Sequence, residues 1–361
     1  MMATTLARYI GWRFLTTILA VFGSIFALIM ILDFVEMLRK SADLPGGTTL
    51  MLAFVSFLRT PSIAEKVLPF VMLGSTMIAL VNLTRRLELV VARAAGVSVW
   101  QFLTPVVLLA ILLGILSTVI YNPLSAAMKL RADRIETKIA GRTLKTSAEG
   151  GIWIRQRSVD GQSILRAESA SDAGTNLAAV TVFVYDRDGH FLERVEAPRG
   201  KFTSGAWELY GSRVNAPGEN PREVDTYLLA TNLTMEQVTQ SFIAPDSVPF
   251  WTLPSVIARS QAAGLDANKY RLKYQELLSR PLLLAAMVFI AASFSLRFFR
   301  FGGNARMVSG GVAAGFVLYV ATKVTSDLGG AGLLSAPVAA WSPALIGSML
   351  GVLVLLHLED G

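Results

Sequence analysis

The sequence predicts an α-helical membrane protein with six transmembrane helices, three before and three after an inserted all-β domain of the jelly-roll type. Two observations support this fold class. The 361 residues are 53% hydrophobic and only 16% charged, whereas roughly a quarter of the residues in soluble proteins are charged. In addition, residues 141–250 hold 25 of the 59 charged residues and carry a net charge of −3, so the rest of the chain carries +10. One polar block therefore interrupts an apolar, basic chain.

Three apolar segments before the polar block are long enough to cross a bilayer, which needs about 20 residues of helix. They run from Phe14 to Leu32, from Val67 to Thr84 and from Trp100 to Tyr121. Asn122-Pro123 follows the third segment and is expected to end its spanning helix, because proline removes a backbone donor. The charged stretch 129–138 is expected to extend the helical pattern outward.

Three more apolar segments follow the polar block. They are Pro281–Leu296, Met307–Thr322 and about Ala336–Leu356. The first two are short for a span, so their helices are expected to extend into the charged flanks. The preceding stretch, 266–280, has an amphipathic helical pattern. We expect it to form a helix at the membrane interface, with Pro281 starting the fourth transmembrane helix.

Two GxxxG spacings lie in the last two of these segments, at Gly311–Gly315 and Gly347–Gly351. Small residues at this spacing let two helices approach closely. We therefore expect these glycines to pack against neighbouring helices.

Basic residues in the short loops predict the orientation of the helices, since cytoplasmic loops are enriched in Lys and Arg. The side of the N-terminus has eight: Arg8, Arg13, Arg85, Arg86, Arg93, Arg297, Arg300 and Arg306. The opposite side has four: Arg39, Lys40, Arg59 and Lys66. Both termini are therefore expected in the cytoplasm and the polar block outside the membrane. Because the basic surplus is explained by topology, no nucleic-acid partner is expected.

Within the polar block the apolar residues alternate with a period of two, which predicts β-strands. The stretch Ala179–Tyr185, the turn 186–189 and the stretch Phe191–Val195 are typical of a β-hairpin. Further short strands are predicted at residues 151–156, 163–167, 201–203, 206–210 and 226–229. Many short strands at this spacing favour a sandwich or jelly roll. The pattern leaves open whether the sheet takes up acyl chains or is a structural sandwich with an apolar core.

These patterns divide the chain into an N-terminal transmembrane half (1–136), a β-domain (137–250) and a C-terminal transmembrane half (251–361) that begins with the interfacial helix. The chain has no cysteine, and its two histidines lie in different kinds of segment. It also lacks a phosphate-binding loop, a nucleophile elbow and an HExxH motif. We therefore predict no catalytic residue, no metal site and no cofactor.

The segment between the second and third transmembrane helices, Leu83–Ser98, has the pattern of a short amphipathic helix on the cytoplasmic side. A helix places Leu87, Val90 and Val91 on one side, and Gly96 stands where a left-handed residue would end it. Such a helix either inserts into a groove of a soluble partner or lies at the membrane interface with its charged face in water. The pattern alone leaves both alternatives open.

The residues of this segment resemble the coupling helix of the lipopolysaccharide export permeases, the LptF/LptG family. The resemblance rests on Leu87-Glu88-Leu89-Val90-Val91, Arg93-Ala94 and Gly96-Val97-Ser98, within a coupling helix of about residues 84–97. Supporting stretches are Arg8-Tyr9-Ile10, Phe14-Leu15, Asp33-Phe34-Val35-Glu36, Leu38-Arg39-Lys40, Tyr270, Leu272 and 315–320. The resemblance covers the whole chain and is closer to the LptG branch of the family than to the LptF branch.

The resemblance implies a permease subunit of an ABC transporter, a multi-pass protein of the bacterial inner membrane whose β-domain is periplasmic. Such a subunit pairs with a paralogous LptF-like permease and a cytoplasmic ATPase dimer, and it extracts lipopolysaccharide from the inner membrane. The lipid then passes to periplasmic and single-span bridge proteins built from β-jelly-rolls, and on to the outer membrane. ATP hydrolysis belongs to the partner, so this chain is expected to be non-catalytic. The alternative is a membrane-anchored periplasmic scaffold or adaptor that moves no lipid.

The resemblance also implies which residues act. Contacts with the ATPase are expected from Arg86, Glu88, Leu89 and Arg93. Contacts with the lipid are expected from Arg39, Lys40, Arg131, Arg134, Phe316 and Lys323. Arginine and lysine suit the phosphate groups of such a lipid. The alternatives are snorkelling or local i,i+4 pairs, Glu36 with Lys40 and Lys323 with Asp327.

Overall fold

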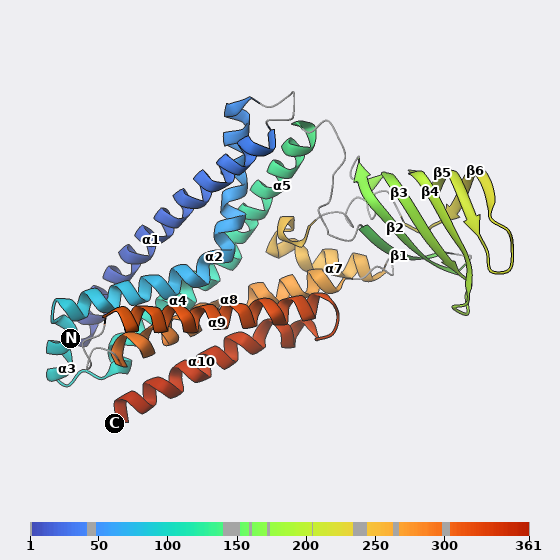
Figure 1. Ribbon diagram of the computed structural model, residues 1–361. Coiled ribbons are helices and arrows are strands. Elements are labelled where there is room, and N and C mark those ends of the chain that lie inside the picture. The colour runs from blue at the N-terminus through green and yellow to red at the C-terminus, as the bar shows by residue number, and fades with distance from the viewer. Residues whose placement is uncertain are drawn as a thin grey trace.

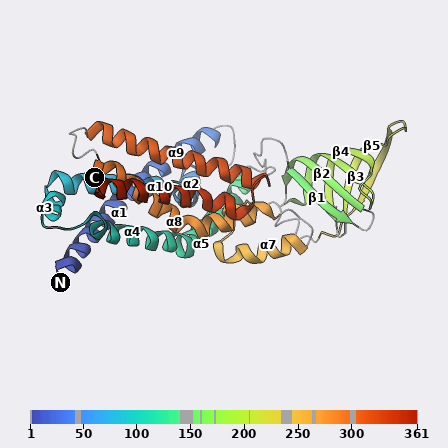
Figure 2. The same ribbon diagram turned by 90° about the horizontal axis from the view of Figure 1, so that it is seen from below.

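The computed structural model describes residues 2–41, 48–139, 152–158, 161–171, 174–203, 205–233, 244–262, 267–297 and 304–360. The long helices pack side by side over part of their length and spread apart towards one end of the molecule, where a β-sheet lies beyond some of them (Figure 1). Both termini and the short helix α3 (Glu88–Ala94) lie at the other end in both views (Figures 1 and 2). The molecule therefore has two chemically different ends joined by helices.

The N-terminal half consists of long helices that extend well beyond the predicted apolar segments. They are α1 (Met2–Ser41), α2 (Thr49–Arg85), α4 (Val99–Leu116), a π-helical turn (Ser117–Tyr121) and α5 (Asn122–Ile139). The prediction that Asn122-Pro123 ends the third span is wrong. Pro123 has no N–H for the carbonyl of Val119, four residues earlier, but this carbonyl accepts a hydrogen bond of 3.2 Å from Trp251 Nε1. The helix therefore continues through the proline into α5.

The C-terminal half contains α7 (Leu253–Ala262), α8 (Asn268–Arg297), α9 (Asn304–Gly330) and α10 (Ala336–Asp360). Pro281 lies inside α8, so the prediction that it starts a helix is wrong, and the expected interfacial helix 266–280 is largely the first part of α8. The carbonyl of Leu277, which Pro281 leaves without its donor, accepts from Thr118 Oγ1 at 2.9 Å. Gly114 also allows close approach, because a Cβ there would lie 2.4 Å from Pro281 Cα.

Five helices of the described ranges are long and apolar enough to cross a membrane. They are Thr5–Arg39, Thr49–Arg85, Val99–Glu136, Asn268–Leu296 and Ala336–His357. The remaining long helix, α9, coincides with the predicted fifth span and packs against α2, α8 and α10. The arrangement of three helices, a β-insert and three helices agrees with the prediction. Within the described residues, however, α9 is not among the helices whose length and apolar composition suit a membrane span.

Both GxxxG spacings are packed between helices, as predicted. On α9, a Cβ at Gly311 would lie 2.6 Å from Met77 Cε, and one at Gly315 would lie 2.7 Å from Leu73 Cδ1. On α10, the atoms that a Cβ would meet belong to Leu318 for Gly347 and to Phe289 for Gly351. These glycines therefore let α9 approach α2, and α10 approach α8 and α9.

The insert is all-β, as predicted. Its strands are β1 (Ile152–Ser158), β2 (Gly161–Ser171), β3 (Asn176–Tyr185), β4 (Phe191–Thr203), β5 (Ala206–Asn215) and β6 (Arg222–Ala230). They form one antiparallel sheet in which each strand pairs with its sequence neighbours. The predicted hairpin across residues 186–189 is β3–β4. The strands pair in the order β1 to β6, so the described strands follow one another across the sheet.

One face of the sheet carries an apolar core. Its centre includes Leu165, Val182, Val195, Trp207 and Leu209, all fully buried. Val182 pairs with both Leu165 and Val195 across the adjacent strands, so the core follows the strand register. A single sheet with one apolar face has the alternation expected of half-buried antiparallel strands.

Candidate functional site

The predicted coupling segment is a seven-residue helix, α3, that leaves α2 through a tight turn. Leu87 adopts a left-handed conformation with φ 61°, and its N–H donates to the carbonyl of Thr84 at 2.9 Å. At the other end Gly96 has φ 83°, and the N–H of Val97 donates to the carbonyl of Ala92 at 3.1 Å. This is the geometry of a Schellman cap, so the predicted role of Gly96 is confirmed. The turn at Leu87 makes α3 shorter than the predicted helix.

The faces of α3 differ sharply in exposure. Leu89 is 5% exposed and belongs to the main core of the helical bundle. Val91 is 66% exposed and Leu87 is 60% exposed, and Arg86 and Arg93 are also exposed. Leu89 therefore anchors α3 to its own chain and does not offer its side chain to a partner. The outer face combines aliphatic residues with arginines.

Glu88 connects α3 to the first helix. One of its carboxylate oxygens, Oε2, accepts a hydrogen bond of 3.1 Å from the hydroxyl of Tyr9. Tyr9 lies near the start of α1 and is 45% exposed. The sequence pattern singled out Glu88 but gave no sign that Tyr9 is its partner, because the two residues are 79 positions apart.

The predicted lipid-binding bases fall into two separate groups. Arg39 is exposed at the end of α1, and Arg131 and Arg134 are exposed on α5. These ends of α1 and α5 pack together with α2 around a core of Met37, Leu52, Val55, Leu58 and Ala132. The side chain of Lys40 lies outside the described residues. Phe316 and Lys323, in contrast, lie on α9, in another part of the molecule (Figure 1).

The two candidates on α9 have different surroundings. The ring of Phe316 is 56% exposed. The ammonium of Lys323 contacts Asp327 Oδ1 at 2.8 Å, and both side chains are more than half exposed. The local i,i+4 pair that was the alternative for Lys323 is therefore present in this structure, while Phe316 presents an apolar surface.

Arg59, which the sequence suggested only as a loop charge, lies within α2 and contacts α1 and α5. Its guanidinium lies 3.9 Å from Asp33 on α1 and 3.3 Å from Glu136 on α5. Asp33 is buried, and its second oxygen, Oδ2, has no hydrogen-bond partner among the described residues. The arginine therefore stabilises the packing of α1, α2 and α5 near Arg39.

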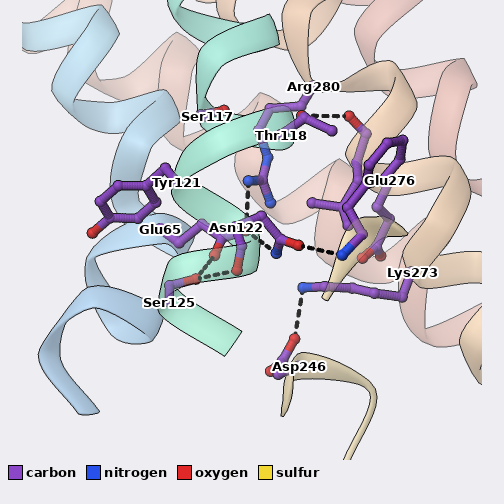
Figure 3. A network of polar contacts seen from close by, with 12 residues as sticks. Glu65, Ser117, Thr118, Tyr121, Asn122, Ser125, Asp246, Lys273, Glu276 and Arg280 are labelled. Carbon is purple, nitrogen blue, oxygen red and sulfur yellow. Dashed lines mark hydrogen bonds and ion pairs between the residues drawn. The ribbon is translucent and has the colours of Figure 1, made fainter. Parts of the chain in front are cut away.

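A buried polar network lies where α2, α5 and α8 meet (Figure 3). The carboxylate of Glu65 is 5% exposed and contacts Arg280 Nη1 at 2.6 Å. It also accepts hydrogen bonds from Asn122 Nδ2 at 2.8 Å and Ser125 Oγ at 2.6 Å. Sequence reasoning missed this network. Its signal was present, however, since Glu65, Asn122 and Arg280 each stand beside an end of a predicted apolar segment.

Three lysines from the same three helices surround Asp246, which lies in the 3₁₀ turn Pro245–Ser247 after the sheet. Its carboxylate oxygens lie 2.6 Å from Lys273 Nζ, 2.7 Å from Lys66 Nζ and 3.7 Å from Lys129 Nζ. Burial opposes ionisation of Asp246, but the positive charges of Lys273 and Lys66 outweigh it and hold the pKa of this carboxyl well below its usual value,.

One group of possible metal ligands occurs among the described residues, at the β3–β4 turn: Asp186, Asp188 and His190. Asp186 Oδ1 accepts the backbone N–H groups of Asp188 at 2.9 Å and His190 at 2.8 Å. These bonds, led by that from His190, lower the pKa of Asp186. The contacts are those of an Asx-type turn, which explains the group without a metal.

Comparisons with known proteins agree with the resemblance seen in the coupling segment. The family model of the lipopolysaccharide export system permease LptF/LptG matches residues 8–357. The chain is 25% identical over 333 residues to the lipopolysaccharide export system permease protein LptG of Escherichia coli K12, covering 90% of each chain. It is 26% identical over 335 residues to the protein of the same name from Haemophilus influenzae, again covering 90% of each chain. Because the family model covers nearly the whole sequence, the chain belongs to the LptF/LptG family of lipopolysaccharide export permeases.

Proposed function

We propose that this chain is the non-catalytic transmembrane subunit of an ATP-driven transporter that extracts lipopolysaccharide from the bacterial inner membrane. The observation that carries the proposal is the outer face of α3, where Leu87 and Val91 are exposed between Arg86 and Arg93. An apolar face on a short helix suits insertion into a groove of a soluble partner. We assign that partner as a cytoplasmic ATPase dimer.

The proposed orientation puts α3 and both termini in the cytoplasm and the β-sheet in the periplasm. The sequence count of eight bases near the cytoplasmic ends of the predicted spans, against four near the opposite ends, supports it,. The same orientation supports the division into two transmembrane halves, 1–136 and 251–361, around a periplasmic domain, 137–250. The second permease of the complex would be a paralogue, and β-jelly-roll bridge proteins would receive the lipid.

In this proposal, movement of the ATPase reaches the membrane helices through two contacts of α3. The buried side chain of Leu89 ties α3 to the core of the bundle, and the hydrogen bond between Glu88 and Tyr9 ties it to α1. Arg86, Glu88 and Arg93 then contact the ATPase, while Leu89 transmits the displacement. This division of roles refines the prediction that all four residues contact the partner.

The proposed lipid route follows the exposed surfaces of α1 and α9. Only 11% of the residues in the most apolar stretch of α1 are buried in the chain, so this helix offers most of its apolar surface to lipid or to a partner. Phe316 offers a similar surface on α9. Arg39, Lys40, Arg131 and Arg134 would bind the phosphates of the headgroup. Lys323, in the separate group on α9, would contact a phosphate only after leaving Asp327.

Glu88→Lys tests the coupling role. It removes the acceptor for the Tyr9 hydroxyl and reverses the charge at the start of α3. We expect lipid release by the reconstituted transporter to fall about tenfold or more, the scale of a coupling free energy of 1–3 kcal/mol. The matched control is Glu219→Lys, an exposed acid of the β5–β6 turn. If Glu88→Lys kept full ATPase association and full lipid release, the coupling role would be wrong.

A further inference from the structure

The buried pair of Glu65 and Arg280 connects the two transmembrane halves. The two side chains are 5% and 12% exposed, and the two residues lie 215 positions apart in the sequence. Burying two charges is costly, and a well-packed apolar pair is often as stable as a buried ion pair. Here both carboxylate oxygens of Glu65 are occupied, by Arg280 and Asn122 on one side and by Ser125 on the other. Stability alone therefore does not explain why charges stand at this junction.

The same level of the bundle contains three irregular helical segments. Pro61 lies inside α2, the π-helical turn Ser117–Tyr121 separates α4 from α5, and Pro281 lies inside α8. Side chains of the π-helical turn reach both neighbours: the Tyr121 hydroxyl donates to the carbonyl of Pro61 at 3.0 Å, and Thr118 donates to the carbonyl of Leu277. Prolines and π-turns are the positions where helices bend. The three helices can therefore change direction together at this level.

Asn122 extends this junction to the segment that leaves the β-sheet. Its Nδ2 donates to Glu65, while its Oδ1 accepts the backbone N–H of Phe250 at 3.0 Å. Trp251 donates to the carbonyl of Val119 in the π-helical turn, and Asp246 contacts lysines of α2, α5 and α8. We call residues 245–252 the return segment. The buried side-chain amide of Asn122 therefore connects the ion pair of Glu65 and Arg280 to this segment (Figure 3).

We propose that Glu65, Arg280 and Asn122 are positioning residues that couple movement of α2, α5 and α8 to the β-domain. This inference rests on the proposed function, since it assumes a transport cycle. When the helices bend at the junction, the ion pair keeps α2 and α8 in register, and Asn122 carries the displacement to the return segment. The return segment follows the sheet in the sequence, so we expect the β-domain to move when this segment moves.

The double variant Glu65→Met with Arg280→Met tests the proposal in the assembled transporter. It removes both charges at once, so no unpaired charge is left buried, and assembly and ATP hydrolysis should persist. We expect release of lipid to an acceptor to fall about tenfold, the scale of a typical coupling free energy. The control is Arg194→Gln with Glu196→Gln, which removes a half-exposed ion pair on β4 and should leave release unchanged.

A spectroscopic readout separates positioning from a merely structural role. The chain contains no cysteine, so spin labels can be attached at Asp188→Cys in the β3–β4 turn and Leu124→Cys on α5, both exposed. With the native network we expect a distance between the labels that shifts when ATP binds. In the double methionine variant we expect a broader distribution with no shift.

Asn122→Ala tests the proposal independently if the double methionine variant fails to assemble. It keeps the ion pair but removes the link to Phe250, so the same loss of lipid release and of the distance shift is expected. Full lipid release by Asn122→Ala, or by an assembled double methionine variant, would overturn the proposal. Failure of the native complex itself to release lipid would instead overturn the proposed function.

Discussion

The charges of Asp246 and Glu65 are paired with basic residues from other elements. Asp246 contacts lysines of α2, α5 and α8, and Glu65 contacts an arginine of the opposite half. Lys66 and Arg59, which the sequence placed in a loop and the structure places in α2, contributed to the count of bases that predicted the orientation. The partner of each charge depends on which helices pack together. Residues on different helices lie far apart in the sequence, so these pairs could not be predicted from local patterns.

Asp246→Asn should lower the thermal stability of the chain at about pH 7, because the ionised carboxylate of Asp246 is stabilised in the folded protein by Lys273 and Lys66,. A carboxyl whose pKa is lowered from 3.8 contributes stability that is present above that value and is lost as the pH falls below it. The difference in melting temperature between native protein and variant should therefore narrow below about pH 4. Thermal unfolding in detergent at pH 7, 5 and 3 measures it. A difference that grew towards low pH would contradict the assignment.

Gly96 and Leu89 show which properties of a residue its local sequence pattern predicts and which it does not. A glycine after a helical segment predicts a left-handed cap for a local steric reason, and Gly96 has that conformation. The exposure of Leu89 depends on the direction that α3 takes after Leu87, and a leucine with positive φ is rare enough that no pattern predicts it. The candidate residue was therefore found, but its buried role was not.

At the scale of elements, helices continue through prolines where a neighbouring side chain replaces the missing donor. Thr118 does this for the carbonyl of Leu277 below Pro281, and Trp251 does it for Val119 below Pro123. Sequence rules place a helix end at such prolines because they assume a helix without neighbours. The six helical segments were predictable from apolar length, whereas their true ends were not.

A double-mutant cycle tests whether the Thr118 hydroxyl replaces the backbone donor that Pro281 lacks. Thr118→Val keeps the side-chain shape but leaves the Leu277 carbonyl unpaired, and we expect a cost of about 1–3 kcal/mol. Pro281→Ala supplies a backbone N–H for the same carbonyl, so in that background Thr118→Val should cost much less. Denaturation of the four proteins gives the coupling energy. Additive effects would show that Thr118 does not replace the donor that Pro281 lacks.

The ends of the strands, like the ends of the helices, could not be predicted from the sequence. The sequence predicted separate strands at 191–195 and 201–203, and Pro198 and Gly200 lie between them. The structure has one strand, β4, whose pairing with β5 is irregular opposite Gly211, a residue with φ 64°. Gly211 lies against the Pro198 ring, where a Cβ would be 3.5 Å from Cγ. The interruption is absorbed by a cross-strand contact that sequence spacing does not reveal.

At the scale of the whole molecule, the two ends differ in chemistry and the proposed lipid route lies between them. The base group on α1 and α5 and the apolar surface of α9 lie in different parts of the molecule (Figure 1). A headgroup held by Arg39 would therefore leave Phe316 to contact acyl chains in the membrane. A scaffold that moves no lipid would make neither contact.

Photocrosslinking distinguishes a permease from a scaffold. A photoreactive residue at Arg39 or at Phe316 should capture lipopolysaccharide during ATP turnover in the assembled complex. The same residue at Asp188, exposed in the β3–β4 turn, serves as a control for capture at a site away from the membrane helices. Capture at neither Arg39 nor Phe316 would favour the scaffold alternative.

The separation of Glu65 and Arg280 also has a consequence for biosynthesis. The carboxylate on α2 is made 215 residues before its arginine, an interval of about 10 to 40 s at ribosomal speeds of roughly 5–20 residues per second. The β-insert can fold during that interval, because its described strands pair only with sequence neighbours,. Arrival of α8 then supplies the arginine that pairs with this carboxylate. The last steps of membrane insertion should therefore decide when the subunit becomes competent to assemble.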